Sequence, residues 1–453
     1  MCIRDRSWSL QRASRGEQPL WMGITLACMI GQIGTAGGGF GFGYSAVNST
    51  GDSFTKIPWK SLPQGKNNIK DFIPVARITD MLEKPGETFD YDGQKLKYPD
   101  IKLVYWAGGN PFHHHQDLNR LVKAWQHPNT IIVNEIWWNA QARHADIIFP
   151  ANTALERNDL MLNPRDPTIV ANKKSIDSFA NSKSDYEIFS GLANRLGFES
   201  TFTDNKNEME WIEFLWEESK KIAKDFKINL PDFKKFWANG FYEVPCPDKK
   251  KIMFENFRND PENFPLKTPS GKIEISSDTI ESFQLKDCLS HPSWFEPYEW
   301  LGKINKYTLH LISNQPTHRL HGQLDNASDS RKSKIKDREP VLINSSDANK
   351  RSIKDDDIVM LYNDRGKVLA GAILSEDVMP GVVVLSTGAW FDPNYTLNTE
   401  VHGNPNVLTN DVGTSSLGQG PTSHTTLIDI KKESKEEIAD VMIFNSLSFK
   451  ENT

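Results

Sequence analysis

The sequence predicts a mixed α/β protein: a doubly wound parallel sheet, then a helical peripheral region, then an all-β barrel. Two observations carry this prediction. Between Lys102 and Asp185, short apolar strands alternate with helical segments, which is the pattern of a parallel α/β sheet. From Tyr307 onward, short strands recur with turns between them, which is typical of a barrel or a sandwich.

Composition limits the classes of protein to consider. The chain has 453 residues, enough for several domains. Charged residues make up 25% and the net charge is -6, so nothing favours a nucleic-acid partner. The four cysteines include no CxxC pair, so the ligand spacing of zinc ribbons and iron–sulfur clusters is missing.

The most apolar stretch lies between Trp21 and Tyr44 and contains three consecutive glycines. Its apolar run is interrupted at Gln32 and is shorter than the roughly 20 residues that a bilayer span needs. The stretch therefore predicts a buried helix that runs into a glycine-rich loop, and no membrane span.

Three strands and two helices are predicted in the α/β region. The strands are IKLVYWAGG (101–109), TIIVNE (130–135) and HADIIFPAN (144–152), each rich in the apolar residues of buried parallel strands. The helices are QDLNRLVKAWQH (116–127) and DYEIFSGLANRLG (185–197), whose apolar residues recur at helical spacing.

The remaining chain divides into three parts. Residues 201–295 are predicted to form the peripheral helical region, with KTPSGKIEISS (267–277) as a strand that rejoins the body. Residues 296–430 are predicted to form the barrel, in which NDRG is a hairpin turn. Residues 431–453 are a charged tail that we expect to be loosely held. The first domain is accordingly assigned to residues 1–200.

The segment GGNPFHHHQD follows the first α/β strand, and its three histidines raise the possibility of a metal site. Adjacent side chains in an extended loop point in different directions, and no HExxH motif accompanies them. A loop at the carboxyl end of a parallel strand is instead typical of nucleotide binding at a switch point of the sheet. We therefore favour a loop that holds a nucleotide through Asn110 and the histidines.

Asn134 and Glu135 end the next strand. A carboxylate there accepts hydrogen bonds from a guanine or a ribose, or else it is a solvated loop acid. Arg157 fits a surface ion pair or a phosphate clamp. Asp185 starts a helix and is most simply its N-cap.

Two polar stretches of the barrel region are candidate ligand-holding loops. SNQPTHRLHGQLD (313–325) follows a strand and contains more hydrogen-bonding side chains than a surface turn needs. VHGNPNVLTNDVGTSSLGQGP (401–421) is a long loop of similar composition. A polar surface turn remains the alternative for the first stretch.

These segments resemble the dimethyl sulfoxide reductase family of molybdenum enzymes, in the branch of trimethylamine-N-oxide, dimethyl sulfoxide and biotin sulfoxide reductases. The resemblance runs from Trp8 to Ile430 and rests on motifs such as YWAGGNPFHHHQDLNRLVKAW, ARHADIIFPANTALERND, SNQPTHRLHGQLD and VHGNPNVLTNDVGTSS. It implies a bis(molybdopterin guanine dinucleotide) cofactor that holds molybdenum, and no iron–sulfur cluster. It also implies an S-oxide or N-oxide substrate, a c-type cytochrome or soluble reductant as electron donor, and a periplasmic location rather than a cytoplasmic one.

The resemblance also assigns residues. Trp8 and Arg12 match residues that line the active-site funnel. The positions that match cofactor-binding residues are Gly109, Asn110, His114, Asn134, Glu135, Arg157, Asp185, Ser313, Asn314, Gln315, His321, Gln323, Asn404, Asn406 and Gln419. Arg143, His144 and Asp146 of the ARHADI motif are expected to be mainly structural.

One departure from the family concerns length. Full members are nearly twice as long, and the serine that ligates their molybdenum lies in the N-terminal half. The chain is therefore expected to be the C-terminal part of such an enzyme, inactive alone and with an uncovered apolar face. The alternatives are a non-catalytic remnant that binds a pterin or a nucleotide, and a histidine metalloenzyme.

Overall fold

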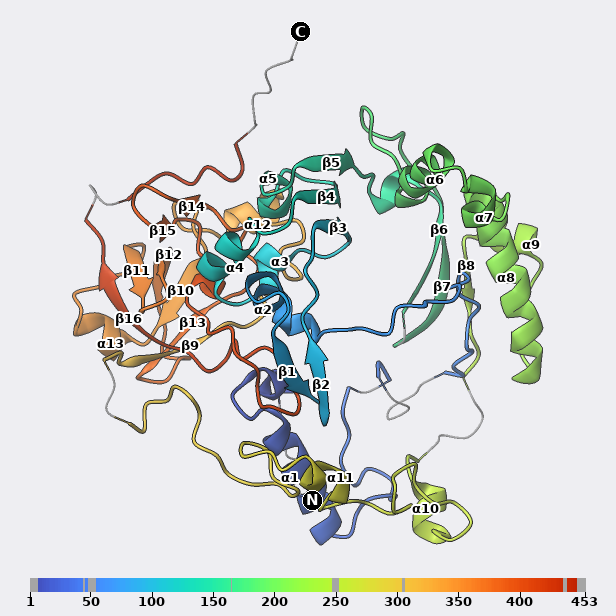
Figure 1. Ribbon diagram of the computed structural model, residues 1–453, viewed down its shortest axis with the longest axis horizontal. Coiled ribbons are helices and arrows are strands. Elements are labelled where there is room, and N and C mark those ends of the chain that lie inside the picture. The colour runs from blue at the N-terminus through green and yellow to red at the C-terminus, as the bar shows by residue number, and fades with distance from the viewer. Residues whose placement is uncertain are drawn as a thin grey trace.

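The computed structural model describes residues 7–43, 45–47, 54–163, 165–246, 252–303, 306–434 and 438–445. A β barrel lies at one side of the molecule and a parallel sheet with its helices lies next to it (Figure 1). A mainly helical region occupies the opposite side. The predicted combination of a parallel α/β sheet and a barrel is therefore confirmed.

The parallel sheet contains β3 (Leu103–Ala107), β4 (Thr130–Glu135) and β5 (Ile147–Pro150), in that order. The helices α4 (Leu118–Ala124) and α5 (Ala140–Arg143) connect them. All three predicted strands and the first predicted helix are present. The strand order does not reverse among the described strands, so the expected binding crevice at a switch point is not found there.

Six strands close the barrel. Their order is β10-β13-β9-β16-β11-β12, and β10 also pairs with β12. Two further strands, β14 (Pro393–Asn394) and β15 (Thr399–Glu400), extend the sheet from β12. The six strands are β9 (Leu309–Ile312), β10 (Pro340–Ile343), β11 (Ile358–Tyr362), β12 (Lys367–Leu374), β13 (Val382–Leu385) and β16 (Leu427–Lys432).

Local sequence explains part of the barrel. In the NDRG turn between β11 and β12, the Asn363 amide donates to the Gly366 carbonyl at 3.1 Å, so the hairpin prediction is confirmed. The strand β10 was not predicted, because its four residues begin with a proline and give too short an apolar run.

One hydrophobic core joins the parallel sheet to the barrel. Phe112 and Trp125, from the α/β side, belong to the same buried cluster as Leu311, Val383 and Phe391 of the barrel side. The rings of Phe112 and Phe391 stack with centroids 6.1 Å apart. Because each such side chain contributes about 1.5–3 kcal/mol when buried, this shared core fixes the barrel against the sheet.

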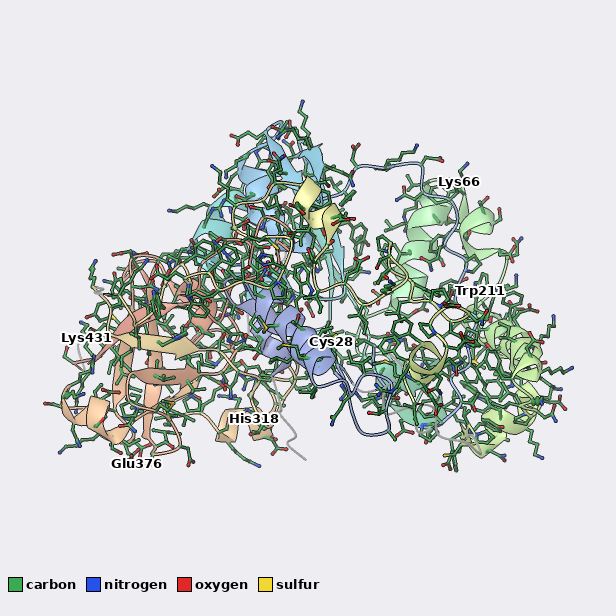
Figure 2. The ribbon with its side chains drawn as sticks, turned by 90° about the horizontal axis from the view of Figure 1, so that it is seen from below. Cys28, Lys66, Trp211, His318, Glu376 and Lys431 are labelled. Carbon is green, nitrogen blue, oxygen red and sulfur yellow. The ribbon has the colours of Figure 1, made fainter. Side chains whose placement is uncertain are left out.

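The helical region has its own core. It contains α6 (Asp185–Arg195), α7 (Glu199–Thr203), α8 (Glu208–Asp225) and α9 (Phe233–Asn239). Trp216 of α8 stacks on Phe236 of α9, with 3.7 Å between ring centroids. Figure 2 shows Trp211 of α8 far from the barrel, on which Glu376 lies.

This region also contains a small antiparallel sheet that the sequence did not predict. It consists of β6 (Asp159–Asn163), β7 (Asp166–Asn172) and β8 (Phe241–Glu243). The first two form a hairpin, whereas β8 follows about 70 residues later, a pairing that local patterns do not reveal. A second unpredicted hairpin is formed by β1 (Thr88–Tyr91) and β2 (Gln94–Lys97).

The strand predicted at residues 267–277 is wrong. The segment forms turns and bends between α10 (Glu255–Asn259) and α11 (Asp278–Ser282). Its polar side chains bond to nearby backbone atoms: the Thr268 hydroxyl donates to the Lys272 carbonyl at 2.6 Å, and the Ser270 amide donates to Glu274 at 3.0 Å. Such local bonds compete with the pairing of a strand.

A helix forms near Trp21 as predicted, but the prediction that it is buried is wrong. The helix α1 (Glu17–Met29) forms, but only Gln18, Gly23 and Ala27 are buried. Leu26 and Met29 are exposed, because no described segment packs over that face of the helix. None of the described helices is long and apolar enough to cross a membrane.

The C-terminal segment 438–445 is docked rather than loose. Ile443 is buried, and its amide donates to the Asp392 carboxylate at 2.9 Å. Arg143 of α5 donates to the carbonyls of Ile443 and Asn445 at 2.9 and 3.2 Å. The apolar residues within the charged tail therefore hold this part of it against both the barrel and the α/β region.

Candidate functional site

The loop after β3 is shaped by two glycines and an asparagine. Gly108 and Gly109 have φ values of 76° and 75°, which only glycine adopts without strain. Asn110 then caps α3 (Pro111–His114), because its side-chain oxygen accepts from the Phe112 amide at 3.0 Å. The backbone at the two glycines is open, and a ligand can approach it closely.

The three consecutive imidazoles point to different partners. His113 contacts the Asn110 amide at 3.3 Å and stacks on Trp390, whereas the His114 side chain is exposed. His115 contacts Thr79 Oγ1 at 2.7 Å and Asp411 Oδ2 at 3.3 Å. No group of three or more metal-ligating side chains occurs among the described residues, so the geometry does not favour a histidine metal centre.

Two barrel loops leave the barrel at one edge, because β9 and β13 are parallel neighbours. The Ser386 hydroxyl donates to Asn314 Oδ1 at 2.8 Å, and the Thr387 amide donates to the Asn314 carbonyl at 2.9 Å. Gln315 accepts from the His321 amide at 3.0 Å. The polar residues predicted in this loop are thus brought together, with Asn314, Gln315 and Gln323 exposed and Ser313 buried.

The asparagines of the 401–421 loop bond to backbone carbonyls of other segments. The Asn404 amide donates to the carbonyls of Phe112 and Ala389 at 3.0 and 2.9 Å. Asn406 donates to the His113 carbonyl at 3.3 Å. Both side chains are almost fully buried and hold the loop after β3 in place, and their role in cofactor binding stays a prediction.

Gln419 lies apart from these loops. Its amide donates to the carbonyl of Ser416 at 3.3 Å and also to that of Asp90 in β1. Its role in ligand binding stays a prediction.

Trp390 was not singled out from the sequence, although it lies within the range of the family resemblance. Its indole nitrogen donates to the Gly322 carbonyl at 2.7 Å, and its amide donates to Asp325 at 3.0 Å. Its ring stacks on His113 with 6.1 Å between centroids. Trp390 therefore connects the loop after β3 with the loop after β9.

Arg12 ends the 3-10 helix η1 (Trp8–Arg12), and its positive charge acts on three histidines. The His424 amide donates to the Arg12 carbonyl at 3.0 Å. Surrounding protein atoms desolvate the imidazoles and lower the pKa of His114, His321 and His424, although His114 keeps part of its surface exposed. The positive charge of Arg12 lowers each pKa further. The sequence had not predicted His424, since a single histidine in a polar loop carries no distinct signal.

Trp8 is placed elsewhere. Its ring packs against Phe42 at 4.5 Å between centroids, and its role in lining a funnel stays a prediction.

The carboxyl end of β4 forms a second cluster. Asn134 donates to Asp185 Oδ1 at 2.8 Å and accepts from the Tyr105 hydroxyl at 3.0 Å. Asp185 is exposed and is not the N-cap of α6, because Ser184 caps that helix. Burial raises the pKa of Glu135, which accepts from the Ile136 amide at 2.9 Å.

Arg157 is only weakly held. Its Nε lies 3.6 Å from Asp159 Oδ2, and one Nη donates to the Asn152 carbonyl at 3.5 Å. The side-chain oxygen of Asn152 is buried and has no hydrogen-bond partner among the described residues. Arg157 therefore makes only these two long contacts among the described residues.

Two models of molybdopterin protein families match this chain. A family model described as "Molybdopterin oxidoreductase" matches residues 5–195, and one described as "Molydopterin dinucleotide binding domain" matches residues 309–427. Biotin sulfoxide reductase of Cereibacter sphaeroides is 46% identical over 97% of this chain. Trimethylamine-N-oxide reductase of Haemophilus influenzae is 44% identical over 94% of this chain.

The chain belongs to the dimethyl sulfoxide reductase family of molybdopterin oxidoreductases. It spans 59% of the biotin sulfoxide reductase and 54% of the trimethylamine-N-oxide reductase. Among solved structures, acetylene hydratase from Pelobacter acetylenicus has a TM-score of 0.59 at 16% identity, covering 78% of this chain and 46% of that protein. This last likeness concerns the fold alone.

The side chains of the ARHADI motif bond to the backbone, which agrees with the structural role expected for them. His144 Nδ1 bonds the Ala140 carbonyl at 2.7 Å, and Asp146 accepts from the Ile131 amide at 2.8 Å. Arg143 holds the C-terminal segment described above.

Two buried histidines predict an acid-sensitive fold. Burial lowers the pKa of His113 and of His402 to about 3, against about 6.5 in the unfolded chain. The unfolded state therefore binds more protons below pH 6.5, and stability falls as the pH falls from there. We expect a loss of about 1.5–2 kcal/mol for each histidine between pH 6.5 and 5, measured by urea unfolding. An equally steep loss in the double variant H113N/H402N would contradict this assignment.

Proposed function

We propose that this chain forms the cofactor-binding part of a molybdenum oxotransferase that reduces an S-oxide or an N-oxide. The observation that carries the proposal is that the loop after β3, which belongs to the parallel sheet, contacts polar loops of the barrel. Asn404 and Asn406 bond the backbone of α3, and Trp390 bonds the loop after β9. The two matched family regions thus meet at one polar surface.

The donor set of this surface fits a bis(molybdopterin guanine dinucleotide). Exposed amide and imidazole groups of Asn314, Gln315, Gln323 and His114 offer hydrogen bonds to the pterins. The glycines after β3 leave room for the backbone to approach a phosphate. The serine that ligates molybdenum in the family is not assigned to any residue of this chain.

The cluster at the carboxyl end of β4 suits a guanine. The carboxylates of Asp185 and Glu135 accept hydrogen bonds, which matches the ring N–H and amino group of guanine. Arg157, with its weak ion pair, offers a cation for a phosphate. Asn134 orients the Asp185 carboxylate through its 2.8 Å hydrogen bond.

When bound, a molybdenum dithiolene cofactor supplies two-electron oxygen-atom chemistry. Reduction of an S-oxide to a sulfide consumes two electrons and two protons and releases one water. An electron donor is therefore required, and we propose a c-type cytochrome or a soluble reductant. Arg12, placed among His114, His321 and His424, is proposed to line the approach of the substrate.

The test is cofactor content. The chain, produced in a host that makes the cofactor, is expected to retain molybdenum and to release guanosine monophosphate on acid hydrolysis. D185N is expected to weaken retention about fivefold to a hundredfold, since one hydrogen-bonded charge contributes about 1–3 kcal/mol. The control D177N changes a fully exposed carboxylate paired with Lys174 and is expected to have no effect.

Turnover is then measured with a reduced viologen dye and three oxides: biotin sulfoxide, dimethyl sulfoxide and trimethylamine N-oxide. A loaded protein that reduces one of them supports the proposal. A chain that acquires neither molybdenum nor guanine nucleotide contradicts it, and a loaded chain that is inactive toward all three restricts it to cofactor binding.

A further inference from the structure

Four charged side chains form a buried ionic quartet in the segment between β9 and β10. They are Arg319, Asp325, Lys334 and Glu339. Lys334 Nζ is 2.9 Å from both Asp325 and Glu339, and Arg319 is 3.4 and 3.0 Å from the same two carboxylates. The four side chains have at most 1% of their surface exposed. Two cations and two anions thus neutralise one another in the interior.

Stability alone does not explain such a group. Removing charges from water costs about as much as their attraction returns, and apolar residues of similar volume are often equally stabilising. The role of the quartet is inferred instead from its hydrogen bonds to the neighbouring loops.

Arg319 ties two loops together. Its Nε donates to the His321 carbonyl at 3.1 Å, and one Nη donates to the Thr387 carbonyl at 3.3 Å. These carbonyls belong to the two loops that leave β9 and β13 at the same barrel edge. The planar fork of arginine reaches both, whereas the single ammonium of lysine does not reproduce that geometry.

The rest of the quartet extends this connection. Asp325 accepts from the Trp390 amide at 3.0 Å, and the Glu339 amide donates to the His402 carbonyl at 2.9 Å. The other Nη of Arg319 contacts His318 at 2.8 Å, and Figure 2 shows His318 at the border of the barrel. The quartet is therefore hydrogen-bonded to the loop after β9, to the loop after β13 and to the 401–421 loop.

We propose that Arg319 is a positioning residue, which touches no ligand itself and sets the spacing of the loops that carry His321 and Thr387. This inference rests on the proposed cofactor-binding function of those loops. It adds a residue that the family resemblance had not assigned, and it predicts that geometry, rather than charge, is what the arginine contributes.

The test compares two arginine-to-lysine substitutions in the full chain. R319K keeps the quartet neutral but loses the fork. R338K is the matched control: Arg338 is 4% exposed and donates to the backbone carbonyls of Lys336, at 2.7 Å, and of Ala439, neither of which lies in the polar loops. Amide hydrogen exchange and cofactor content are measured for both variants.

R319K is expected to speed exchange at the amides of His321, Thr387 and Trp390 at least tenfold and to lower cofactor retention at least fivefold, with the barrel strands unchanged. R338K is expected to leave both readouts at the loops unchanged. Unaltered exchange at these three amides in R319K overturns the inference. Because exchange is measured without the cofactor, this result is distinct from a failure of the wild-type chain to bind it.

Discussion

Replacing Asp411 with alanine is expected to lower the free energy of unfolding by about 3–5 kcal/mol, the usual cost of removing one member of a buried ion pair. The carboxylate has 1% of its side chain exposed and lies 3.1 Å from Arg77 and 3.3 Å from Arg120 and His115. Without it, Asp80, at 2.9 Å, is the anionic partner that Arg77 keeps among the described residues. Urea unfolding followed by tryptophan fluorescence measures the change.

The location of Asp411 extends the expected effect to the site. The residue belongs to the 401–421 loop, whereas Arg77 ends the 3-10 helix η2 (Val75–Arg77) and Arg120 lies in α4. The control D364A removes an exposed carboxylate that pairs with Lys306, where little or no loss of stability is expected. Equal losses in the two variants would show that the buried cluster does not join the loop to the α/β region.

Gly388→Ala is the second substitution with a large expected effect. Gly388 has a φ of 95°, and a Cβ built there lies 2.0 Å from the His321 carbonyl oxygen. An alanine therefore carries a backbone penalty of about 1 kcal/mol and an overpacking penalty of about 1–3 kcal/mol. We expect an unfolding free energy lower by about 2–4 kcal/mol, together with reduced cofactor content, because the His321 backbone must move.

Gly197 provides the matched control. Its φ is 83°, and nothing lies within 4 Å of a Cβ built there. G197A therefore tests the backbone penalty alone, with an expected loss of about 1 kcal/mol and normal cofactor content. If G388A and G197A behave alike, the two loops are not in the close contact that the structure shows.

Sequence patterns predicted the elements whose cause is local. The apolar strands β3, β4 and β5 and the turn at NDRG follow from periodicity and turn chemistry. The same patterns failed where distant partners decide the outcome. The strand β8 pairs only because β7 offers an edge, and α1 is exposed although its composition is that of a buried helix.

The candidate site divides in the same way. The polar residues after β9 could be singled out because they interrupt an apolar alternation in a short stretch. The contacts that organise them could not, since Trp390 and Arg319 act through carbonyls of other loops. The hydrogen bonds from the buried amides of Asn404 and Asn406 to the backbone around α3 were likewise not foreseen, because their partners lie about 290 residues away in the sequence.

The closing strand of the barrel has a consequence for biosynthesis. β16 pairs with both β9 and β11, and it lies at residues 427–432, so the barrel cannot close until these residues have left the ribosome. Until then, Phe112, Leu118 and Leu121 lack the apolar surface that they share with the barrel. We therefore expect the α/β region to keep part of its apolar surface uncovered while β16 is being synthesised, and exposed surface of this kind makes nascent chains prone to aggregate.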